Sequence, residues 1–250
     1  MLRNSLQTKV LTIALFLMFV ISPITPAKAG VNFWTSVGPE GGVFTSLMID
    51  PTNPNTFYLS SPYSGVYKSV DQGGSWRLVN SGLQDIQVVK LAINTNGVLY
   101  AMTEGGYIFR SINGAEGWSK IYSFQEFVHV QTLVTHPSHP DILFLVDKQG
   151  VYKSVDSGIS WALISGDLAN IPIGVLAINP WVSTILYSLT QEDLYISTDS
   201  GYHWRLSDDG LPGEYLLSIA IDPLVPTNLY VGAKDGVFKS VNGGYSWSLI

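Results

Sequence analysis

The sequence predicts an all-β fold of many short strands, and three observations lead to this prediction. The 250 residues are 46% hydrophobic and 13% charged, which gives ample apolar side chain for a core. They include 24 Gly and 13 Pro among 7 Trp, 13 Tyr and 10 Phe, a composition typical of strands separated by turns. Five tryptophans also recur at separations of 42, 43, 43 and 43 residues, which indicates a repeat architecture. They are Trp76, Trp118, Trp161, Trp204 and Trp247.

The first element in chain order is an expected secretory leader. Arg3 and Lys9 precede the apolar run 10–21, and Ala27-Lys28-Ala29 forms an A-x-A cleavage site. This run of twelve residues is shorter than the roughly 20 that a membrane-spanning helix needs, so cleavage is favoured over an uncleaved anchor. We expect a signal peptide over residues 1–29 and a secreted or periplasmic mature chain without a membrane span.

The repeat units follow the leader. In the third copy, the segments 130–135, 142–146, 150–155 and 160–164 are short, apolar or alternating, and bounded by turn-forming residues. A unit of four strands and about 43 residues is typical of a β-propeller blade. We therefore expect five visible blades, over about 43–80, 85–122, 128–165, 172–208 and 215–250.

Each copy contains an eight-residue segment from Ser to Trp, called here the tryptophan motif. Its third residue, Asp or Asn, can accept hydrogen bonds from the N–H groups of its own turn. Glycine at the fifth position allows positive φ, and the tryptophan can pack over the turn, so the motif closes a hairpin. Ala115 replaces this glycine in the second copy, where we expect a strained or altered turn. The residues with these structural roles are Ser69, Asp71, Gly73 and Trp76; Ser111, Asn113 and Trp118; Ser154, Asp156, Gly158 and Trp161; Ser197, Asp199, Gly201 and Trp204; and Ser240, Asn242, Gly244 and Trp247.

At these residues the chain resembles the Asp-box family, or BNR repeats, with the pattern S/T-x-D-x-G-x-x-W. The resemblance covers about residues 43–250, and the unit Asp222–Trp247 is most similar to bacterial relatives of xyloglucanase-type and sortilin-type propellers. It implies that the motif lies between the third and fourth strands, at the blade periphery and away from the binding face. It implies no single function, because such propellers include sialidases, xyloglucan-cleaving endoglucanases, receptors and photosystem II assembly factors.

Charge and residue counts exclude several function classes. Without the leader's Arg3, Lys9 and Lys28, ten basic residues face nineteen acidic ones, a net charge of −9 that disfavours nucleic acid and anionic membranes. The chain has no cysteine, so disulfides, thiol catalysis and thiolate metal sites are excluded. The histidines do not form a metal motif, and we predict no metal or cofactor.

Too few arginines remain for a sialidase or for an arginine-rich docking patch. The mature chain has Arg77, Arg110 and Arg205, and all three occupy repeat-surface positions. A sialidase needs three arginines that converge on the substrate carboxylate. Arginines at these repeat-surface positions are not expected to converge.

A polysaccharide hydrolase of the xyloglucanase type is the alternative enzyme prediction. It needs two carboxylates about 5–10 Å apart, on loops opposite the motifs. The loops between second and third strands carry Glu104, Asp147, Glu192, Asp193 and Asp235. The links between blades carry Glu40, Asp85, Glu126, Asp167, Asp208, Asp209 and Glu214. Turns favour acidic residues in any case, so solvated loop charge explains the same pattern and no catalytic pair is assigned.

A binding or scaffold module for a protein or carbohydrate ligand is the broader prediction. Exposed loop aromatics could anchor a partner or stack on sugar, although aromatic residues in strand-rich chains more often pack in the core. The candidates are Tyr63, Phe124, Phe127, Trp181 and Tyr215. Trp181 stands outside the repeat columns and follows Asn179-Pro180 in a connecting turn, so it is the first choice for a contact residue, with the loop acids as further candidates on the ligand face.

The number of blades in the ring has two interpretations. Trp34 lies 42 residues before Trp76 and begins a segment like a fourth strand. Either five blades close with one spare strand, or the chain is the front part of a longer propeller. We favour the longer propeller, because the fifth copy ends three residues after Trp247, where other copies continue.

Overall fold

The computed structural model describes residues 38–39, 42–124, 129–164, 166–168 and 171–250, and it confirms a β-propeller fold. Its strands form five antiparallel sheets of four strands each, and in every sheet the strands lie side by side in chain order. The expected leader, Trp34, Glu40, Glu126 and Phe127 lie outside the described residues.

The strand bounds show the repeat directly. The first blade contains β1 (Ser46–Ile49), β2 (Phe57–Ser61), β3 (Gly65–Ser69) and β4 (Arg77–Leu78). The second contains β5 (Val88–Ile93), β6 (Leu99–Thr103), β7 (Tyr107–Ser111) and β8 (Ser119–Ser123). The third contains β9 (Thr132–Thr135), β10 (Leu143–Asp147), β11 (Gly150–Ser154) and β12 (Ala162–Leu163). The fourth contains β13 (Val175–Ile178), β14 (Leu186–Leu189), β15 (Leu194–Ser197) and β16 (Arg205–Leu206). The fifth contains β17 (Leu216–Ile221), β18 (Leu229–Ala233), β19 (Gly236–Ser240) and β20 (Ser248–Leu249).

Helical structure in the described residues is limited to one 3-10 turn, η1 (Gly166–Leu168), between the third and fourth blades. No helix in this part of the chain is long and apolar enough to cross a membrane.

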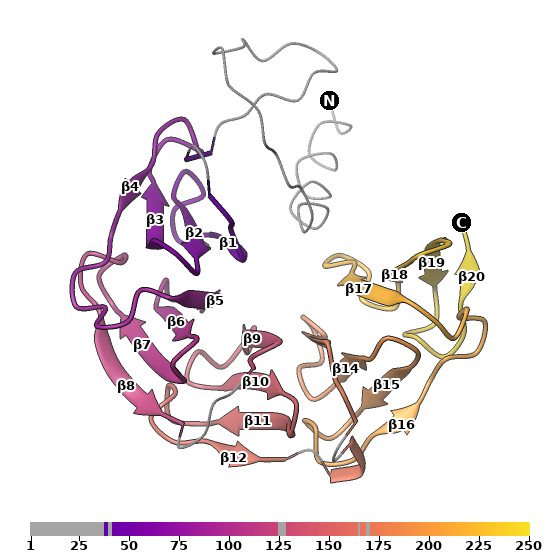
Figure 1. Cartoon of the computed structure of the whole chain (residues 1–250). Helices are drawn as coiled ribbons and strands as arrows, with labels where there is room; N and C mark the ends of the chain where they lie inside the picture. Colours follow the sequence, from indigo (N-terminus) through magenta and orange to yellow (C-terminus); the bar gives the residue numbers. More distant parts are fainter. Residues whose placement is uncertain (1–37, 40–41, 125–128, 165, 169–170) are drawn as a thin grey trace.

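The blades are arranged around an arc, with the first strand of each blade on the inner side and the fourth on the outer side (Figure 1). The first and fifth blades stand at the two ends of this arc, so the described residues form an open ring (Figure 1). Whether further blades or a spare strand complete it stays a prediction.

Apolar clusters between successive blades form the core. Side chains alternate across a strand, so each sheet can pack against a neighbour on both faces. In the first four blades, an aromatic residue at the same place in the second strand packs against the following blade and is at most 1% exposed. These residues are Tyr58, Tyr100, Phe144 and Tyr187. In the fifth blade the corresponding Tyr230 is only partly buried, and Val237 is 43% exposed, because no described blade covers that face.

The tryptophan motif holds its hairpin turn through side-chain hydrogen bonds. In the first copy Ser69 Oγ accepts from the N–H of Gly73 at 2.8 Å and donates to Asp71 Oδ1 at 2.7 Å. Asp71 Oδ1 also accepts from the N–H of Ser75 at 2.8 Å. Equivalent bonds recur in the other four motifs. The side chains thus satisfy backbone donors that the turn removes from the sheet.

The motif backbone turns through two consecutive left-handed residues. Ala115 has φ +67° and donates to Ser111 Oγ at 3.0 Å, so the second turn keeps the common geometry and holds a strained residue. The fourth position is also left-handed in every copy, including Gln72, Ser157 and Ser200, which the sequence pattern did not reveal.

Two of the motif tryptophans, Trp118 and Trp247, also bind the backbone of the link from the preceding blade. The N–H of Trp118 donates to the carbonyl of Ser81 and that of Trp247 donates to the carbonyl of Asp209, both at 2.8 Å. Gly82 and Gly210 follow these two acceptors with φ of +87° and +89°, and a Cβ on either glycine would overlap the carbonyl oxygen of the facing tryptophan. The links therefore need glycine for both conformation and space.

Replacing Gly210 with alanine should destabilise the fold much more than the same change at Gly213. Both glycines are left-handed, but a Cβ at Gly213 meets nothing within 4 Å. Gly213→Ala should therefore lower the free energy of unfolding by about 1–2 kcal/mol, the cost of left-handed backbone. Gly210→Ala adds roughly 1–3 kcal/mol of overlap with Trp247. Urea unfolding followed by tryptophan fluorescence tests this difference, and equal unfolding midpoints for the two variants would contradict the contact.

Candidate functional site

The strand order places the connections of every blade at two ends. Turns between first and second strands and between third and fourth strands lie at one end, called here the motif end. Loops between second and third strands lie at the other end. Trp181 is in the β13–β14 turn, at the motif end, whereas Glu104, Glu192 and Asp235 are in second-to-third loops. The expectation that Trp181 and the loop acids share one ligand face is therefore wrong, because antiparallel connections separate them.

Asp147 differs from the expected exposed acid. It ends β10 and is fully buried, because the loop to β11 consists of only Lys148 and Gln149. Its Oδ1 accepts from the N–H groups of Gln149 at 2.8 Å and Gly150 at 3.2 Å, while no described residue bonds its Oδ2. Burial raises the pKa of this carboxyl group. Asp147 is thus a turn-holding residue at a position that Thr103 and Thr190 occupy in neighbouring blades.

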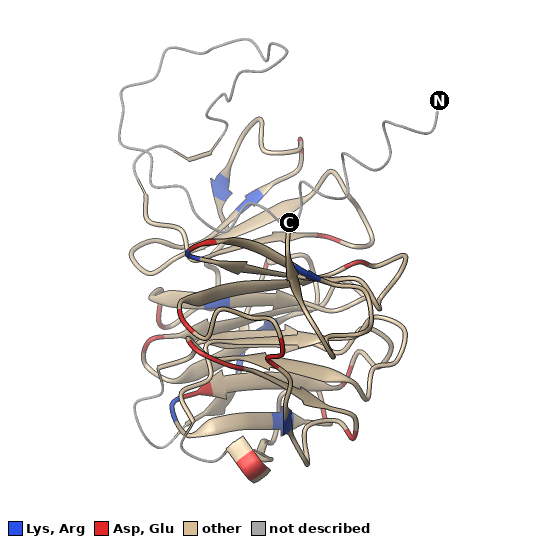
Figure 2. Cartoon of the chain, turned by 90° about the vertical axis from the view of Figure 1, so that its right-hand side faces the viewer, with Lys and Arg blue, Asp and Glu red and all other residues tan. Residues whose placement is uncertain are grey.

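Other acids of the two predicted sets are engaged in local turns. Asp85 accepts from the N–H groups of Gln87 and Gly105, and Asp193 accepts from the Tyr195 hydroxyl at 3.3 Å. Asp167 Oδ2 accepts from the N–H of Trp204 at 3.0 Å and so joins η1 to the fourth motif. Figure 2 shows acidic residues spread over loops at both ends of the sheets. These acids do not converge on one site.

Two carboxylates of the predicted sets do share a hollow. Glu192, from the β14–β15 loop, and Glu214, from the link between the fourth and fifth blades, line a cavity of about 410 Å³ with Tyr215. Tyr215 has φ +54° and its ring lies 4.9 Å from Lys234 Nζ. Asp208 and Asp209 belong to the same link but do not line the hollow.

The histidines act in turns. His136 Nδ1 lies 3.0 Å from the N–H of His139 and 3.1 Å from that of Ser138, which it can bond as acceptor. Burial, with smaller contributions from His139 and Lys153, lowers the pKa of His136 to about 4. Within the described residues, no group of three His, Asp or Glu side chains could hold a metal ion.

The arginines lie in three different blades. Arg77, in β4, pairs with Glu116 of the next motif, and Arg205, in β16, packs 4.2 Å from the ring of Tyr245. Arg110 belongs to β7. They do not form the convergent set that a sialidase requires.

The predicted loop aromatics have different environments. Tyr63 and Tyr215 are exposed, at 73% and 50%. Phe124 is instead packed edge-on against Tyr122 and Tyr152, with ring centroids 4.8 and 5.7 Å apart. Phe124 therefore follows the core alternative and not the contact role. It directly follows β8, which is longer than the other fourth strands, and it is partly buried against the core between the second and third blades.

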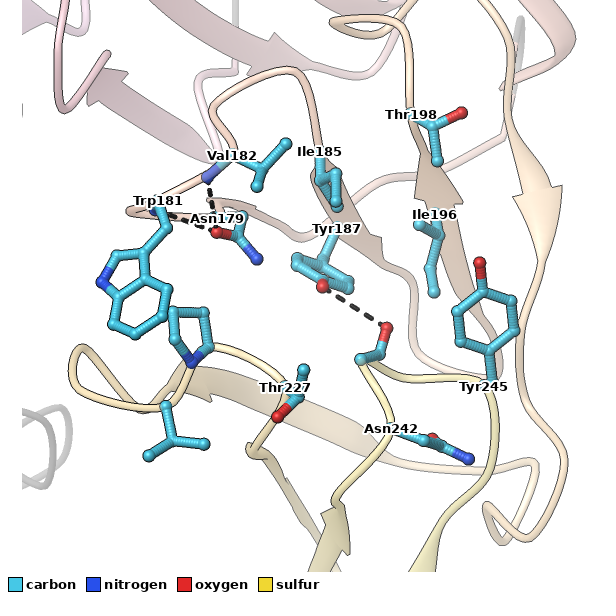
Figure 3. A pocket seen from close by; sticks show the side chains of 13 residues that line it. Asn179, Trp181, Val182, Ile185, Tyr187, Ile196, Thr198, Thr227, Asn242 and Tyr245 are labelled. Atoms are coloured by element: carbon cyan, nitrogen blue, oxygen red, sulfur yellow. Dashed lines mark hydrogen bonds between the residues drawn. The ribbon is translucent and has the colours of Figure 1, made fainter.

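Trp181 lines a pocket of about 290 Å³ between the fourth and fifth blades (Figure 3). The side chain is 67% exposed, but its indole N–H donates to the carbonyl of Pro223 at 3.1 Å. Asn179 Oδ1 accepts from the backbone N–H groups of Trp181 and Val182, both at 2.9 Å. Hydrogen bonds from the backbone N–H and from the indole N–H thus hold the Trp181 side chain in place.

The sequence did not indicate the other residues of this pocket as ligand contacts. Tyr245 lies across it from Trp181, with Ile185, Tyr187 and Ile196 between them (Figure 3). Tyr245 is the sixth residue of the fifth motif, a position that varies among the copies. This variability could have indicated a position free for binding. The sequence could not show the pocket itself, because the pocket forms only where two blades stack.

Comparison with known proteins identifies structures of the same fold but no family. No family model matches the chain, and no curated protein matches its sequence. Among solved structures, the GH74 enzyme of Niastella koreensis is similar, with a TM-score of 0.66 and 18% identity over 82% of this chain. YCF48 from Cyanidioschyzon merolae has a TM-score of 0.62 and 13% identity over 84%. A YCF48 structure bound to D1 peptide has a TM-score of 0.60 and 17% identity over 84%.

The chain spans 38% of the GH74 enzyme and 71% and 68% of the two YCF48 chains. These similarities establish the propeller fold. Because they include both an enzyme and a peptide-bound protein, the fold leaves enzyme status open.

Replacing Asp147 with threonine should stabilise the protein at neutral pH. A hydroxyl can hold the turn, as in neighbouring blades, without a buried unpaired carboxyl oxygen, whose removal is worth about 1–3 kcal/mol. The raised pKa means that the folded state disfavours ionisation, so wild-type stability falls as the pH rises above the ordinary value of 3.8 and through the folded pKa. The advantage of Asp147→Thr should therefore grow from pH 3 to pH 7 in urea unfolding.

The exposed Asp235 provides the matched control, since Asp235→Asn changes a carboxylate in the corresponding loop of the fifth blade. An advantage of Asp147→Thr that does not change with pH would contradict the assigned role of burial.

Proposed function

We propose that the mature chain is an extracytoplasmic β-propeller of the Asp-box type that binds a protein or carbohydrate ligand and catalyses no reaction. Trp181 is the observation that carries the proposal. Trp181 is 67% exposed, yet its indole N–H and its backbone N–H are both hydrogen-bonded, which is typical of a preorganised contact residue.

The use of the carboxylates supports a non-catalytic role. A glycosidase needs one protonated and one ionised carboxyl group on opposite sides of a substrate. Asp85, Asp147, Asp167 and Asp193 instead bond turns, links or a neighbouring tyrosine. These bonds orient the carboxyl groups toward the protein itself.

A glycoside hydrolase remains the second candidate, favoured by the hollow that Glu192 and Glu214 share. Its volume of about 410 Å³ lies within the roughly 300–1,000 Å³ typical of ligand pockets. If the protein is a hydrolase, both glutamates are expected to be essential for turnover.

A substrate screen distinguishes the two candidates. The mature chain is incubated with β-glucan, xyloglucan and sialosides, and released reducing sugar and sialic acid are measured. We expect no turnover, because the carboxylates lack a catalytic arrangement. Turnover that disappears in Glu192→Gln or Glu214→Gln and persists in Asp235→Asn would establish the hydrolase instead.

The extracytoplasmic location has its own test. Expression of the full chain in a bacterial host should yield a product in the periplasm or medium that begins at Gly30, as read by mass spectrometry of its N-terminus. The double variant Ala27→Phe, Ala29→Phe should block this cleavage, because signal peptidase requires small residues at those positions. A wild-type product that stays in the cytoplasm and retains Met1 would contradict the proposed location.

A further inference from the structure

We propose that the pocket between Trp181 and Tyr245 is a binding site for a neutral saccharide of one or two pyranose units. This inference rests on the proposed binding function and names its ligand class and its place. The site lies at the motif end, between the fourth and fifth blades, away from the loop acids.

The two aromatic rings provide fixed platforms. The indole N–H of Trp181 is already bonded to Pro223, so this residue offers its ring face to a ligand and has no donor left. Tyr245 is 60% exposed, and Arg205 packs against its ring. An aromatic face carries partial negative charge, which attracts the positively polarised C–H groups on the face of a pyranose.

The lining between the rings combines apolar and polar side chains. Ile185, Tyr187 and Ile196 lie between Trp181 and Tyr245 in Figure 3. Thr198 and Thr227 are exposed, and neither hydroxyl has a hydrogen-bond partner in the described part of the chain. Two available hydroxyls beside aromatic rings match the alternating C–H and O–H groups of a sugar.

Charge and size narrow the ligand class further. The residues that line the pocket are all uncharged, and Arg205, which packs against the Tyr245 ring, is not among them. A charged ligand would therefore lose water without an ion-pair partner in the lining. A fully apolar ligand would desolvate the threonine hydroxyls without replacing their hydrogen bonds. The volume of about 290 Å³ is at the low end of the roughly 300–1,000 Å³ of ligand pockets, which limits the bound part to a short saccharide.

Titration with neutral oligosaccharides tests the inference. Cellotetraose, maltotetraose and tetra-N-acetylchitotetraose are added to the mature chain, and binding is followed by calorimetry and by tryptophan fluorescence. We expect at least one probe to bind and to perturb the fluorescence. Trp181→Ala should weaken its affinity on the order of tenfold or more, whereas Trp181→Phe should retain part of it.

Matched variants separate binding from folding. Tyr245→Ala should weaken the same probe, and Tyr202→Ala should not, because Tyr202 holds the same position in the fourth motif and does not line the pocket. The double variant Thr198→Val, Thr227→Val keeps both rings and should also weaken binding. It tests the site even if Trp181→Ala fails to fold.

Two outcomes would overturn the inference. One is that none of the three probes binds at millimolar concentration, and the other is that a bound probe is unaffected by Trp181→Ala and by the threonine pair. Neither outcome touches the proposed non-catalytic function, which the turnover screen decides. Binding of a polypeptide that Trp181→Ala weakens, with no probe bound, would leave the binding function standing while removing the saccharide site.

Discussion

The contact between a motif tryptophan and the link from the preceding blade is the constraint on which the arrangement of blades depends. Trp118 donates its backbone N–H to Ser81 and its indole N–H to Val79 at 2.8 Å, and Trp247 bonds Asp209 and Ser207 in the same way. A motif tryptophan also packs on the fifth-position glycine of its own turn. In these copies one residue therefore fixes a hairpin within a blade and the position of that blade on its neighbour, a double role that favours tryptophan at a nearly constant spacing.

Many of the polar side chains in the sequence hold the turns and links that connect the stacked blades. Turns and links contain backbone donors that no strand satisfies, and buried donors without partners are costly. The side chains of Asp71, Asp147 and Asp167 accept such bonds at three different kinds of connection. The acidic composition of this fold thus reflects its many turns. An acidic residue becomes a functional candidate only where its carboxylate does not hold a turn, as with Glu192 and Glu214.

The repeat made the fold and the motif turns predictable, because each role appears five times. Features that occur irregularly were not predictable. Gly82 and Gly210 follow their motif tryptophans by six residues and Gly166 follows by five, and the second copy has Phe124 at the six-residue position, so no column forms. The burial of Phe124 depends on the length of β8, and that of Asp147 on a loop of two residues. Both depend on strand ends, where pattern alone is least informative.

The prediction that Trp181 shares a face with the loop acids failed for a different reason, and this reason also bears on the role of Trp181. Exposed aromatic and acidic residues share the chemistry of binding sites, but the connection order alone decides which end of a blade they occupy. The positions that correspond to Trp181 in the other turns hold Thr52, Asn96, Ser138 and Leu224. Asn179 closes the turn as Asp50, Asn94, His136 and Asp222 close theirs, so the turn does not need an aromatic ring. The ring is an addition to a turn that Asn179 already holds, so the contact role proposed for Trp181 is separate from the bonds that hold the turn.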